Sequence, residues 1–490
     1  MHFKQQRLIS KKFIKSSIIY TLAGTLPTAS ALILLPFYIH HLSTEVYGAL
    51  QIYLVFSLLV QIIVIFSFDT SVYIHFHELK NDRKKLAVFI SSAFVFMLIL
   101  GVGTVAIFSV VGDTVFRIAL PGRNVSFYPY GLAAVGAGAF QAIFKVHSSL
   151  LQSREKPETF FWSNVLSFGL IASFTIIGLQ LYPNSLMGPL VGRLFAGAIA
   201  CTWALVRIFK EFGLHIDFTW LRSSFSFNLY TFIYQLLQWV NNYFDRIVML
   251  IVLSLADVGI YVFATQCLIV LELLMSSLHS TFYPRVVSAV MEQEVKESSQ
   301  SINRYYHGLT GVIMLGVCMG VLGLPWAIET FVWKPEYHAT IPYLPYLAAI
   351  YFFRAMRLFF TAPYGILKYT KPLPFIYLGI AGIKIALMLL LMPSMQIYGV
   401  IVGSLVSAAI EILLLQYNIR AMFRFKFNFF KIIGAPLILF LLIITLEPML
   451  GQRYPYTIHS IYLVACALLL WWGYRKEIQF INPFRQQQNL

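Results

Sequence analysis

The chain alternates long runs of apolar residues with short polar joints, from residue 16 to residue 474. Each run is close to the ~20 apolar residues that an α-helix needs to cross a bilayer. The runs fall at 16–40, 46–68, 86–111, 127–151, 158–181, 185–209, 226–252, 257–281, 307–331, 340–363, 373–393, 397–419, 429–447 and 456–474. The pattern predicts an all-α polytopic membrane protein with about fourteen transmembrane helices. The longest joint, 283–306, is predicted to be a solvated loop.

Composition supports the membrane class. The chain is 59% hydrophobic and 11% charged, with a mean hydropathy of +0.75. Soluble domains carry about 25% charged residues, so a soluble chain this apolar would have no way to cover its surface. The four cysteines all lie in apolar runs and lack metal-ligand spacing, which indicates small core residues. They are Cys201, Cys267, Cys318 and Cys466.

The first apolar run is predicted to be a retained helix and not a cleaved signal peptide. Five basic residues precede it, and Ala29-Ser30-Ala31 resembles a signal-peptidase site. However, the apolar run continues past this site to residue 40, and many further spans follow it.

The basic residues predict the orientation of the chain. The formal net charge is +16, and Lys and Arg collect in short cytoplasmic loops of membrane proteins. With the N-terminus inside, only four of the 36 basic residues fall outside, and six lie within helices. The four are Arg117, Arg123, Lys334 and Arg453. This bias predicts a multi-pass protein of the cytoplasmic (inner) membrane with both termini in the cytoplasm. Because the bias explains the excess of basic residues, we expect no nucleic-acid partner.

A faint internal repeat predicts two lobes. LSTEVYG (42–48) joins the first and second predicted helices, and LSLADVG (253–259) joins the seventh and eighth. Six helices separate the copies, and an even number gives both halves the same orientation, as in transporters built from parallel repeats. We therefore expect an N-terminal lobe at 1–222, a C-terminal lobe at 223–427, and two further helices with a cytoplasmic tail at 428–490.

The seventh predicted helix carries a polar stripe. Its members are spaced three or four residues apart, which places them on one helical face. They are Asn228, Thr231, Gln235, Gln238, Asn242 and Asp245. Polar groups in hydrocarbon cost free energy unless they are paired or wet, so the stripe faces either a water-filled cavity or another helix as polar glue.

Other predicted helices also carry polar and charged residues. These are Gln141, Lys145, Ser148 and Gln152; Arg193; Tyr261, Thr265, Glu272, Ser276 and His279; Arg354, Arg357 and Thr361; Lys384; and Ser404, Ser407 and Glu411. A charge at the centre of a span costs about 3 kcal/mol on insertion scales, so each needs a partner or a function.

The bases within these helices outnumber the acids, which predicts a cationic cavity whose guest is an anion. Arginine would bind phosphate oxygens in a bidentate manner. The candidate substrate-binding bases are Lys145, Arg193, Arg354, Arg357 and Lys384, and the candidate polar lining is Gln141, Gln235, Gln238, Asn242 and Thr265. The alternative is that each base pairs with an acid and only braces the bundle, and that Arg193 snorkels to the interface.

Asp245 and Arg246 are adjacent, so their side chains point about 100° apart on a helix. We expect each to pair across to another helix and to have a structural role.

Several familiar chemistries are missing from the sequence. It contains no GxxxxGK[ST], HExxH or GxSxG motif, and the predicted outer loops are short. His40 and His41 are interpreted as interfacial residues and not as metal ligands. These observations predict a chain that is not an enzyme and needs no cofactor.

Four segments resemble a known family. They are PFYIHHLSTEVYGALQIY (36–53), DRIVMLIVLSLADVGIYVFATQ (245–266), YLPYLAAIYFFRAMRLFFTAPYGILKYTKP (343–372) and IYGVIVGSLVSAAIE (397–411). In order and spacing they resemble the polysaccharide biosynthesis (O-antigen) flippases of the MATE-like superfamily. The Asp-Arg pair followed by Val-Gly-Ile-Tyr is the most specific match.

The resemblance implies a two-lobed bundle around a central, often cationic, cavity. It implies that alternating access of the lobes carries a polyprenyl-diphosphate-linked oligosaccharide from the cytoplasmic to the outer leaflet. Membrane lipids and other polysaccharide-assembly proteins are the further partners it implies. Coupling to a proton or sodium gradient would use Asp69, Glu272 or Glu411, since a buried carboxylate can cycle its proton.

One departure disfavours lipid II as the cargo. The first predicted helix has no arginine, and the second ends with His75 and His77 where relatives often carry a base. Other readings stay open. A drug or toxin antiporter of the same superfamily should have a carboxylate-dominated cavity, a polysaccharide polymerase or ligase should have a large outer loop, and a scaffold would not explain the polar stripes.

Overall fold

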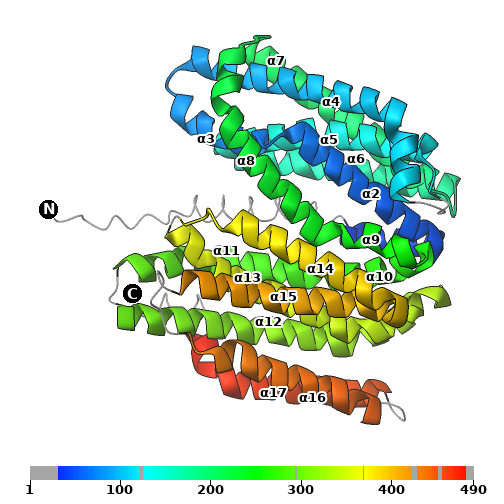
Figure 1. Cartoon of the computed structure of the whole chain (residues 1–490), viewed down its shortest axis with the longest axis vertical. Helices are drawn as coiled ribbons and strands as arrows, with labels where there is room; N and C mark the ends of the chain where they lie inside the picture. Colours follow the sequence, from blue (N-terminus) through cyan, green and yellow to red (C-terminus); the bar gives the residue numbers. More distant parts are fainter. Residues whose placement is uncertain are drawn as a thin grey trace. The chain divides into compact units, whose positions relative to one another are not determined.

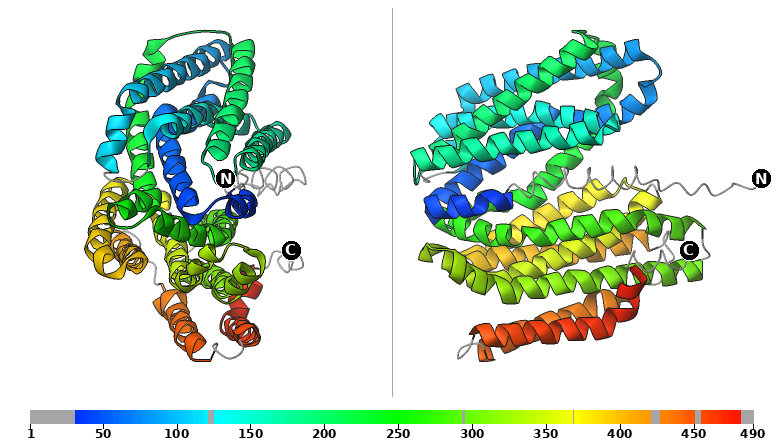
Figure 2. Two further views of the ribbon diagram at one scale, coloured as in Figure 1. Left: turned by 90° about the vertical axis from the view of Figure 1, so that its right-hand side faces the viewer. Right: turned by 180° about the vertical axis from the view of Figure 1, so that it is seen from behind.

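The computed structural model describes residues 31–120, 125–292, 295–367, 369–420, 427–450 and 455–481. Throughout these ranges the regular structure is helical, and no strand occurs within them. Contacts divide the chain into two compact units, Met1–Ile251 and Val252–Leu490, which are described separately. Figure 1 and Figure 2 show that the helices within each unit run side by side.

The first unit begins with the short apolar helix Ala31–His41. Its further elements are α2 (Thr44–Ile65), α3 (Phe68–Leu79), α4 (Arg83–Ala119), η1 (Phe127–Gly131), α5 (Leu132–Ser153), α6 (Pro157–Leu181), α7 (Met187–Phe212), α8 (Phe218–Tyr243) and α9 (Asp245–Val252). Helix α5 packs against α2, α3, α4, α6 and α7. Its run of buried alanines and glycines allows several neighbours to approach it closely, which suits a central helix in a membrane bundle.

Helices α6 and α7 form a close antiparallel pair. A Cβ atom placed on Gly178 would lie 2.5 Å from the Cα of Gly188, and one on Gly188 would lie 2.3 Å from the carbonyl carbon of Gly178. The two backbones therefore touch at a point where only glycine fits, as small residues allow in membrane helix pairs. This contact fixes the position of α7 against α6.

The second unit contains α10 (Leu255–Cys267), α11 (Ile269–Glu292), α12 (Val295–Phe331), η2 (Pro335–Tyr343), α13 (Leu344–Ile366), α14 (Leu373–Met395), α15 (Ile397–Ile419), η3 (Phe430–Gly434), α16 (Ala435–Leu450) and α17 (Pro455–Ile481). Helix α12 packs against α11, α13 and α17, and α15 packs against α13 and α14 (Figure 1). Helix α17 is joined to η3 and α12 by Glu477, which accepts a hydrogen bond from Nζ of Lys431 at 2.8 Å and lies 3.7 Å from Nδ1 of His307.

The two copies of the sequence repeat build the same local structure. Ser43 is the N-cap of α2, and its hydroxyl accepts a hydrogen bond from the backbone N–H of Val46 at 3.3 Å. Ser254 is the N-cap of α10, where Asp257 completes a capping box. Each serine satisfies a backbone donor that the first turn of a helix leaves unpaired. The repeat therefore marks equivalent helix starts in the two units.

Most predicted spans correspond to helices. The all-α polytopic membrane class is confirmed, and eight helices of the described residues are long and apolar enough to cross a membrane. The total of fourteen stays a prediction, because the first run, 16–40, lies mostly outside the described residues. The prediction of a loop at 283–306 is wrong, and the solvation of this joint stays a prediction. Helix α11 continues to Glu292 and α12 begins at Val295, so polar helical ends replace it.

One predicted span, 46–68, ends where the helix breaks, and another, 257–281, is interrupted. Helix α2 ends at Phe66 and Ser67, whose φ angles of 43° and 59° lie in the left-handed region, and α3 then starts. Likewise, α10 ends at Leu268 before α11 begins. Helix α8, which the sequence assigned to the second lobe, packs against α2, α3 and α4 of the first unit. The lobe boundaries stay predictions.

Candidate functional site

The first unit holds a charged group that we call the Asp69 cluster, made of Asp69, Lys145 and Gln235. Nζ of Lys145 on α5 lies 3.7 Å from Oδ2 of Asp69 on α3. The side-chain amide of Gln235 on α8 donates a hydrogen bond to the other carboxylate oxygen, Oδ1, at 3.4 Å. Asp69 is 14% exposed and Lys145 is 49% exposed, so the carboxylate is mostly covered and the ammonium is accessible.

The break between α2 and α3 positions Asp69. The residue falls in the first turn of α3, where its oxygen also accepts a hydrogen bond from the N–H of Thr70 at 2.9 Å. A negative charge is stabilised at the N-terminus of a helix by the free N–H groups and the helix dipole. The interruption of the span therefore creates a favourable position for a carboxylate inside the membrane.

Two candidate residues of the first unit lie apart from this cluster. Nη2 of Arg193 donates a hydrogen bond to the hydroxyl of Tyr38 at 3.4 Å. Nε of Arg193 and the amide nitrogen of Gln141 are buried without a hydrogen-bond partner among the described residues. Within the described ranges, no hydrogen bond or ion pair links either residue to Asp69.

The polar stripe of α8 divides by environment. Asn228 is buried, while Thr231, Gln235, Gln238 and Asn242 are half-buried. The amide of Gln238 donates to the hydroxyl of Tyr234 at 2.5 Å, within the same helix. The stripe thus contributes one residue, Gln235, to the Asp69 cluster.

Asp245 and Arg246 are both buried at the start of α9. Nη1 of Arg246 donates to Oε1 of Gln51 on α2 at 3.4 Å, and its guanidinium lies 5.4 Å from the centre of the Tyr243 ring. Oδ1 of Asp245 accepts a hydrogen bond from the N–H of Arg246 at 2.9 Å. Arg246 thus reaches across to another helix, but to an amide and not to a carboxylate. Gln51 was missed at the sequence level, although it lies inside a matching segment.

The second unit holds a larger charged group, the Glu411 cluster, made of Glu411, Arg357 and Lys384. Oε1 of Glu411 on α15 lies 3.9 Å from Nη1 of Arg357 on α13. Lys384 on α14 is near enough to act electrostatically on the same carboxylate. Glu411 is 9% exposed and Arg357 is 25% exposed. Three helices thus bring two bases to one buried acid.

A second ion pair lies on α11 and α13. Nη1 of Arg354 is 3.6 Å from Oε2 of Glu272, whose side chain is 52% exposed. The guanidinium also lies 5.2 Å from the centre of the Tyr351 ring, and the Tyr351 hydroxyl donates to the backbone oxygen of Thr265 at 2.8 Å. The hydroxyl of Thr265 donates to its own helix, to the oxygen of Val262, at 2.9 Å. Tyr351 therefore connects the two candidate residues, Thr265 and Arg354.

Each unit repeats one arrangement. A carboxylate stands in the first turn of the helix that follows an interruption, Asp69 in α3 and Glu272 in α11. A base from a later helix, Lys145 in α5 or Arg354 in α13, lies within 4 Å of it. The second unit adds Arg357, Lys384 and Glu411, which makes three bases against two acids. An arrangement with more bases than acids suits an anionic guest.

Comparisons with known proteins identify the class and the family. The fold is similar to that of the lipid II flippase MurJ in an inward closed conformation, with a TM-score of 0.71. The match covers 95% of this chain and all of that one, and the two sequences are 15% identical. This chain is 13% identical to an inward-facing multidrug resistance MATE family transporter of the MOP superfamily, with a TM-score of 0.65 over 84% of this chain and 99% of that one.

A third structure is also similar in fold. It is a MOP superfamily transporter from Pyrococcus furiosus, for which a binding pocket of reverse polarity suggests a different function. It is 12% identical, with a TM-score of 0.56 over 84% of this chain and 96% of that one. No curated protein matches the sequence.

The chain is therefore a polytopic membrane protein with the fold of MurJ and the MATE transporters. It belongs to the polysaccharide biosynthesis protein family, whose model matches residues 13–290. The resemblance read from the four sequence segments is confirmed. The named structures are flippases and transporters, as the sequence predicts for a chain that is not an enzyme.

Proposed function

We propose that this chain is a flippase that moves a polyprenyl-diphosphate-linked oligosaccharide from the cytoplasmic to the outer leaflet of the inner membrane. The observation that carries the proposal is the surplus of bases around Glu411 and Glu272. Arg354 lies beside Glu272, and Arg357 and Lys384 lie near Glu411, so three bases gather around these two acids. A diphosphate is an anion that guanidinium groups bind well.

The partial exposure of two charged side chains supports a water-filled path for the cargo. Lys145 and Glu272 are about half exposed, although each belongs to a helix within an apolar stretch. A charge turned toward lipid tails would cost several kcal/mol, so these side chains favour contact with water or a polar guest. We further propose that the protein works by alternating access and that the lipid tail of the cargo stays in the bilayer. Both termini lie in the cytoplasm in this proposal.

Similarity of fold does not identify the lipid that this chain transports. MurJ acts on lipid II, but likeness at 15% identity speaks to architecture alone. His75 and His77 lie in α3, where the family resemblance implies that lipid II flippases carry arginines, and this departure favours another polyprenyl-diphosphate glycan. The family match to polysaccharide biosynthesis supports the same choice.

Coupling to a proton or sodium gradient is part of the proposal, with Asp69, Glu272 and Glu411 as the candidate carboxylates. Glu411 is the most buried of the three. Replacing it with Gln should uncouple transport from an imposed pH or sodium gradient. Transport by Glu411→Gln that still responds to both gradients excludes Glu411 as the coupling group.

The deciding experiment is a leaflet-accessibility assay in proteoliposomes with a fluorescent polyprenyl-diphosphate oligosaccharide. Arg354→Ala and Arg357→Ala should each lower the protein-dependent rate about tenfold, because a hydrogen bond to a charged group contributes about 1.5–3 kcal/mol. Arg420→Ala is the matched control, since this exposed guanidinium stacks over Tyr417 at 4.0 Å at the end of α15.

The outcomes separate the competing functions. Normal transfer by both variants assigns the arginines to bracing the bundle. Absence of protein-dependent transfer, together with export of a cationic dye, favours the drug antiporter. A polymerase would instead lengthen the glycan, which chromatography of the recovered lipid would detect.

A further inference from the structure

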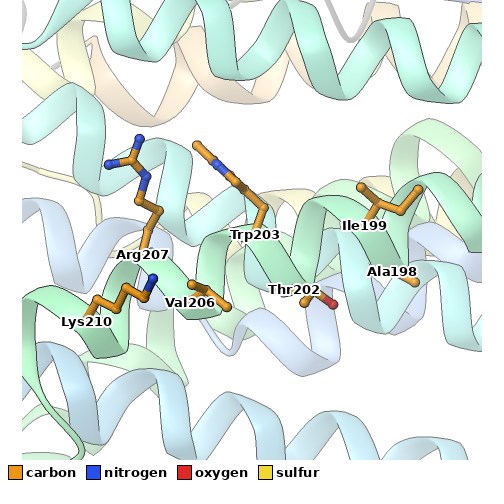
Figure 3. A pocket seen from close by; sticks show the side chains of 7 residues that line it. All are labelled: Ala198, Ile199, Thr202, Trp203, Val206, Arg207 and Lys210. Atoms are coloured by element: carbon orange, nitrogen blue, oxygen red, sulfur yellow. The ribbon is translucent and has the colours of Figure 1, made fainter.

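A groove runs along α7, and its lining contains no residue of the Asp69 cluster in the same unit. It has a volume of about 640 Å³ and is lined by seven residues of this one helix. Figure 3 shows them in two rows along α7. One row is Ile199, Trp203 and Arg207, and the other is Ala198, Thr202, Val206 and Lys210. Residues four apart share one helical face, so each row runs parallel to the helix axis.

The groove changes character along its length. Its first part is apolar and open, since Ile199 is 45% exposed and Val206 is 46% exposed. Its last part carries two cations, Arg207 and Lys210, near the end of α7 at Phe212. Within its row, Trp203 lies between Ile199 and Arg207. An apolar stretch, a tryptophan and then basic residues is the order in which a helix passes from hydrocarbon through the interface to water.

Trp203 packs against α5. Its ring meets the buried ring of His147 on α5 edge to face, with the centroids 5.0 Å apart. The guanidinium of Arg207 lies 5.8 Å from the centre of the Trp203 ring. The wall of the groove at the level of the cations is therefore an ordered structure and not a loose side chain.

The cations of the groove have no carboxylate of their own. Among the described residues, neither Arg207 nor Lys210 forms an ion pair. The neighbouring acid, Glu211, accepts a hydrogen bond from Nη1 of Arg154 at 2.9 Å and is occupied by that pair. Within the described ranges, two positive charges at the end of an apolar groove thus lack a protein anion.

We propose that this groove binds one anionic phospholipid, with its phosphate between Arg207 and Lys210 and one acyl chain along Ala198, Ile199, Thr202 and Val206. Basic pockets beside membrane helices recognise acidic headgroups by this combination of charge and apolar surface. In the predicted topology this end of α7 is cytoplasmic, so the lipid belongs to the inner leaflet. The proposal does not depend on the cargo of the transporter.

The test uses Trp203 as a reporter inside the groove. The full chain is reconstituted in phosphatidylcholine bilayers that contain increasing fractions of brominated phosphatidylglycerol or brominated phosphatidylcholine. The chain has eight tryptophans, so the Trp203 signal is the difference between the wild type and Trp203→Phe. Bromine quenches tryptophan only at close range. We expect half-maximal quenching at about a fivefold lower fraction of phosphatidylglycerol than of phosphatidylcholine.

Matched charge variants decide the interpretation. Arg207→Gln with Lys210→Gln should abolish the preference, and Arg207→Lys with Lys210→Arg should keep it. The control is Lys80→Gln with Lys84→Gln. It removes the same charge around the start of α4, which lies beside the end of α7 because Ser91 donates to the oxygen of Gly213 at 2.9 Å.

Two results would overturn the proposal. One is equal quenching of Trp203 by both lipids in the wild type. The other is an equal loss of preference in the control pair and the groove pair, which would mean that general surface charge and not this groove attracts the lipid.

Discussion

Nη1 of Arg354 lies 3.6 Å from Oε2 of Glu272, and this pair repeats within the second unit the pairing of Lys145 with Asp69 within the first, at 3.7 Å. In both pairs one partner is about half exposed, Glu272 in one and Lys145 in the other. Exposed ion pairs contribute little to stability, commonly below about 1 kcal/mol. In the proposed function, each pair keeps a positive charge positioned where a guest can reach it.

Exchanging the two charges of the second pair tests this interpretation. Arg354→Glu with Glu272→Arg keeps the ion pair but moves the guanidinium from α13 to α11. We expect the thermal stability to stay close to that of the wild type, because a partly exposed pair is replaced by its mirror. We expect the rate of glycolipid transfer to fall about tenfold, because the phosphate loses a positioned donor.

The matched control for this exchange is Asp113→Arg with Arg117→Asp, which reverses an exposed pair 2.6 Å apart on α4. It should leave both stability and transfer unchanged. Full transfer by the Arg354–Glu272 exchange would assign this pair to bracing alone and remove Arg354 from the substrate site.

Removal of Glu411 should cost more stability than removal of Glu272. Glu411 is 9% exposed and lies beside Arg357 and Lys384, whereas Glu272 is half exposed and can be replaced by water. Glu411→Gln leaves two bases without their shared acid, so we expect a loss of about 1–3 kcal/mol in the free energy of unfolding. Glu272→Gln should cost less than about 1 kcal/mol. Denaturant unfolding in detergent measures both, and equal small losses would show that Glu411 does not offset the two bases.

The apolar runs of the sequence predicted most of the helices. Runs of about 20 apolar residues permit few structures other than membrane helices. Periodicity ended one run at residue 68, close to the break at Phe66–Ser67, but it could not locate the break at Leu268, because apolar residues continue through it. It also failed at 283–306, where polar helical ends extend α11 and α12 beyond their apolar parts.

The charged residues of the site were found because charge is rare in these helices, but their partners were not. Spacing along one helix shows which residues share a face and says nothing of the helix opposite. Arg357 and Glu411 are 54 positions apart in the sequence numbering, and only the packing of α13 on α15 brings them together. Gln51 escaped notice because one buried amide among apolar residues gives no pattern.

The contact of α6 with α7 should be sensitive to a single methyl group. Gly178→Ala places a Cβ 2.5 Å from the Cα of Gly188, so the two helices must separate. We expect a loss of about 1–3 kcal/mol, as for other overpacked sites. Gly169→Ala is the matched control on the same helix, because nothing lies within 4 Å of its added Cβ. Thermal unfolding of the purified variants compares them, and equal stability would contradict the close approach.

Cysteine labelling tests the predicted orientation. Asn81→Cys lies between α3 and α4, at a joint predicted to be cytoplasmic, and Lys334→Cys lies between α12 and η2, at a joint predicted to be outside. In a background without the four native cysteines, a membrane-impermeant maleimide added to intact cells should label the Lys334 site and spare the Asn81 site. Opening the cells should expose both.

The predicted labelling pattern follows from the charge of the two joints. The Asn81 joint has four basic residues beside it, Lys80, Arg83, Lys84 and Lys85. Lys334, in contrast, has the acid Glu336 near it. Short loops rich in Lys and Arg stay in the cytoplasm. The cysteine-free chain is the control for background labelling, and permeant maleimide confirms that both sites react. Labelling of the Asn81 site in intact cells would invert the topology, and it would then place the basic end of the α7 groove in the outer leaflet.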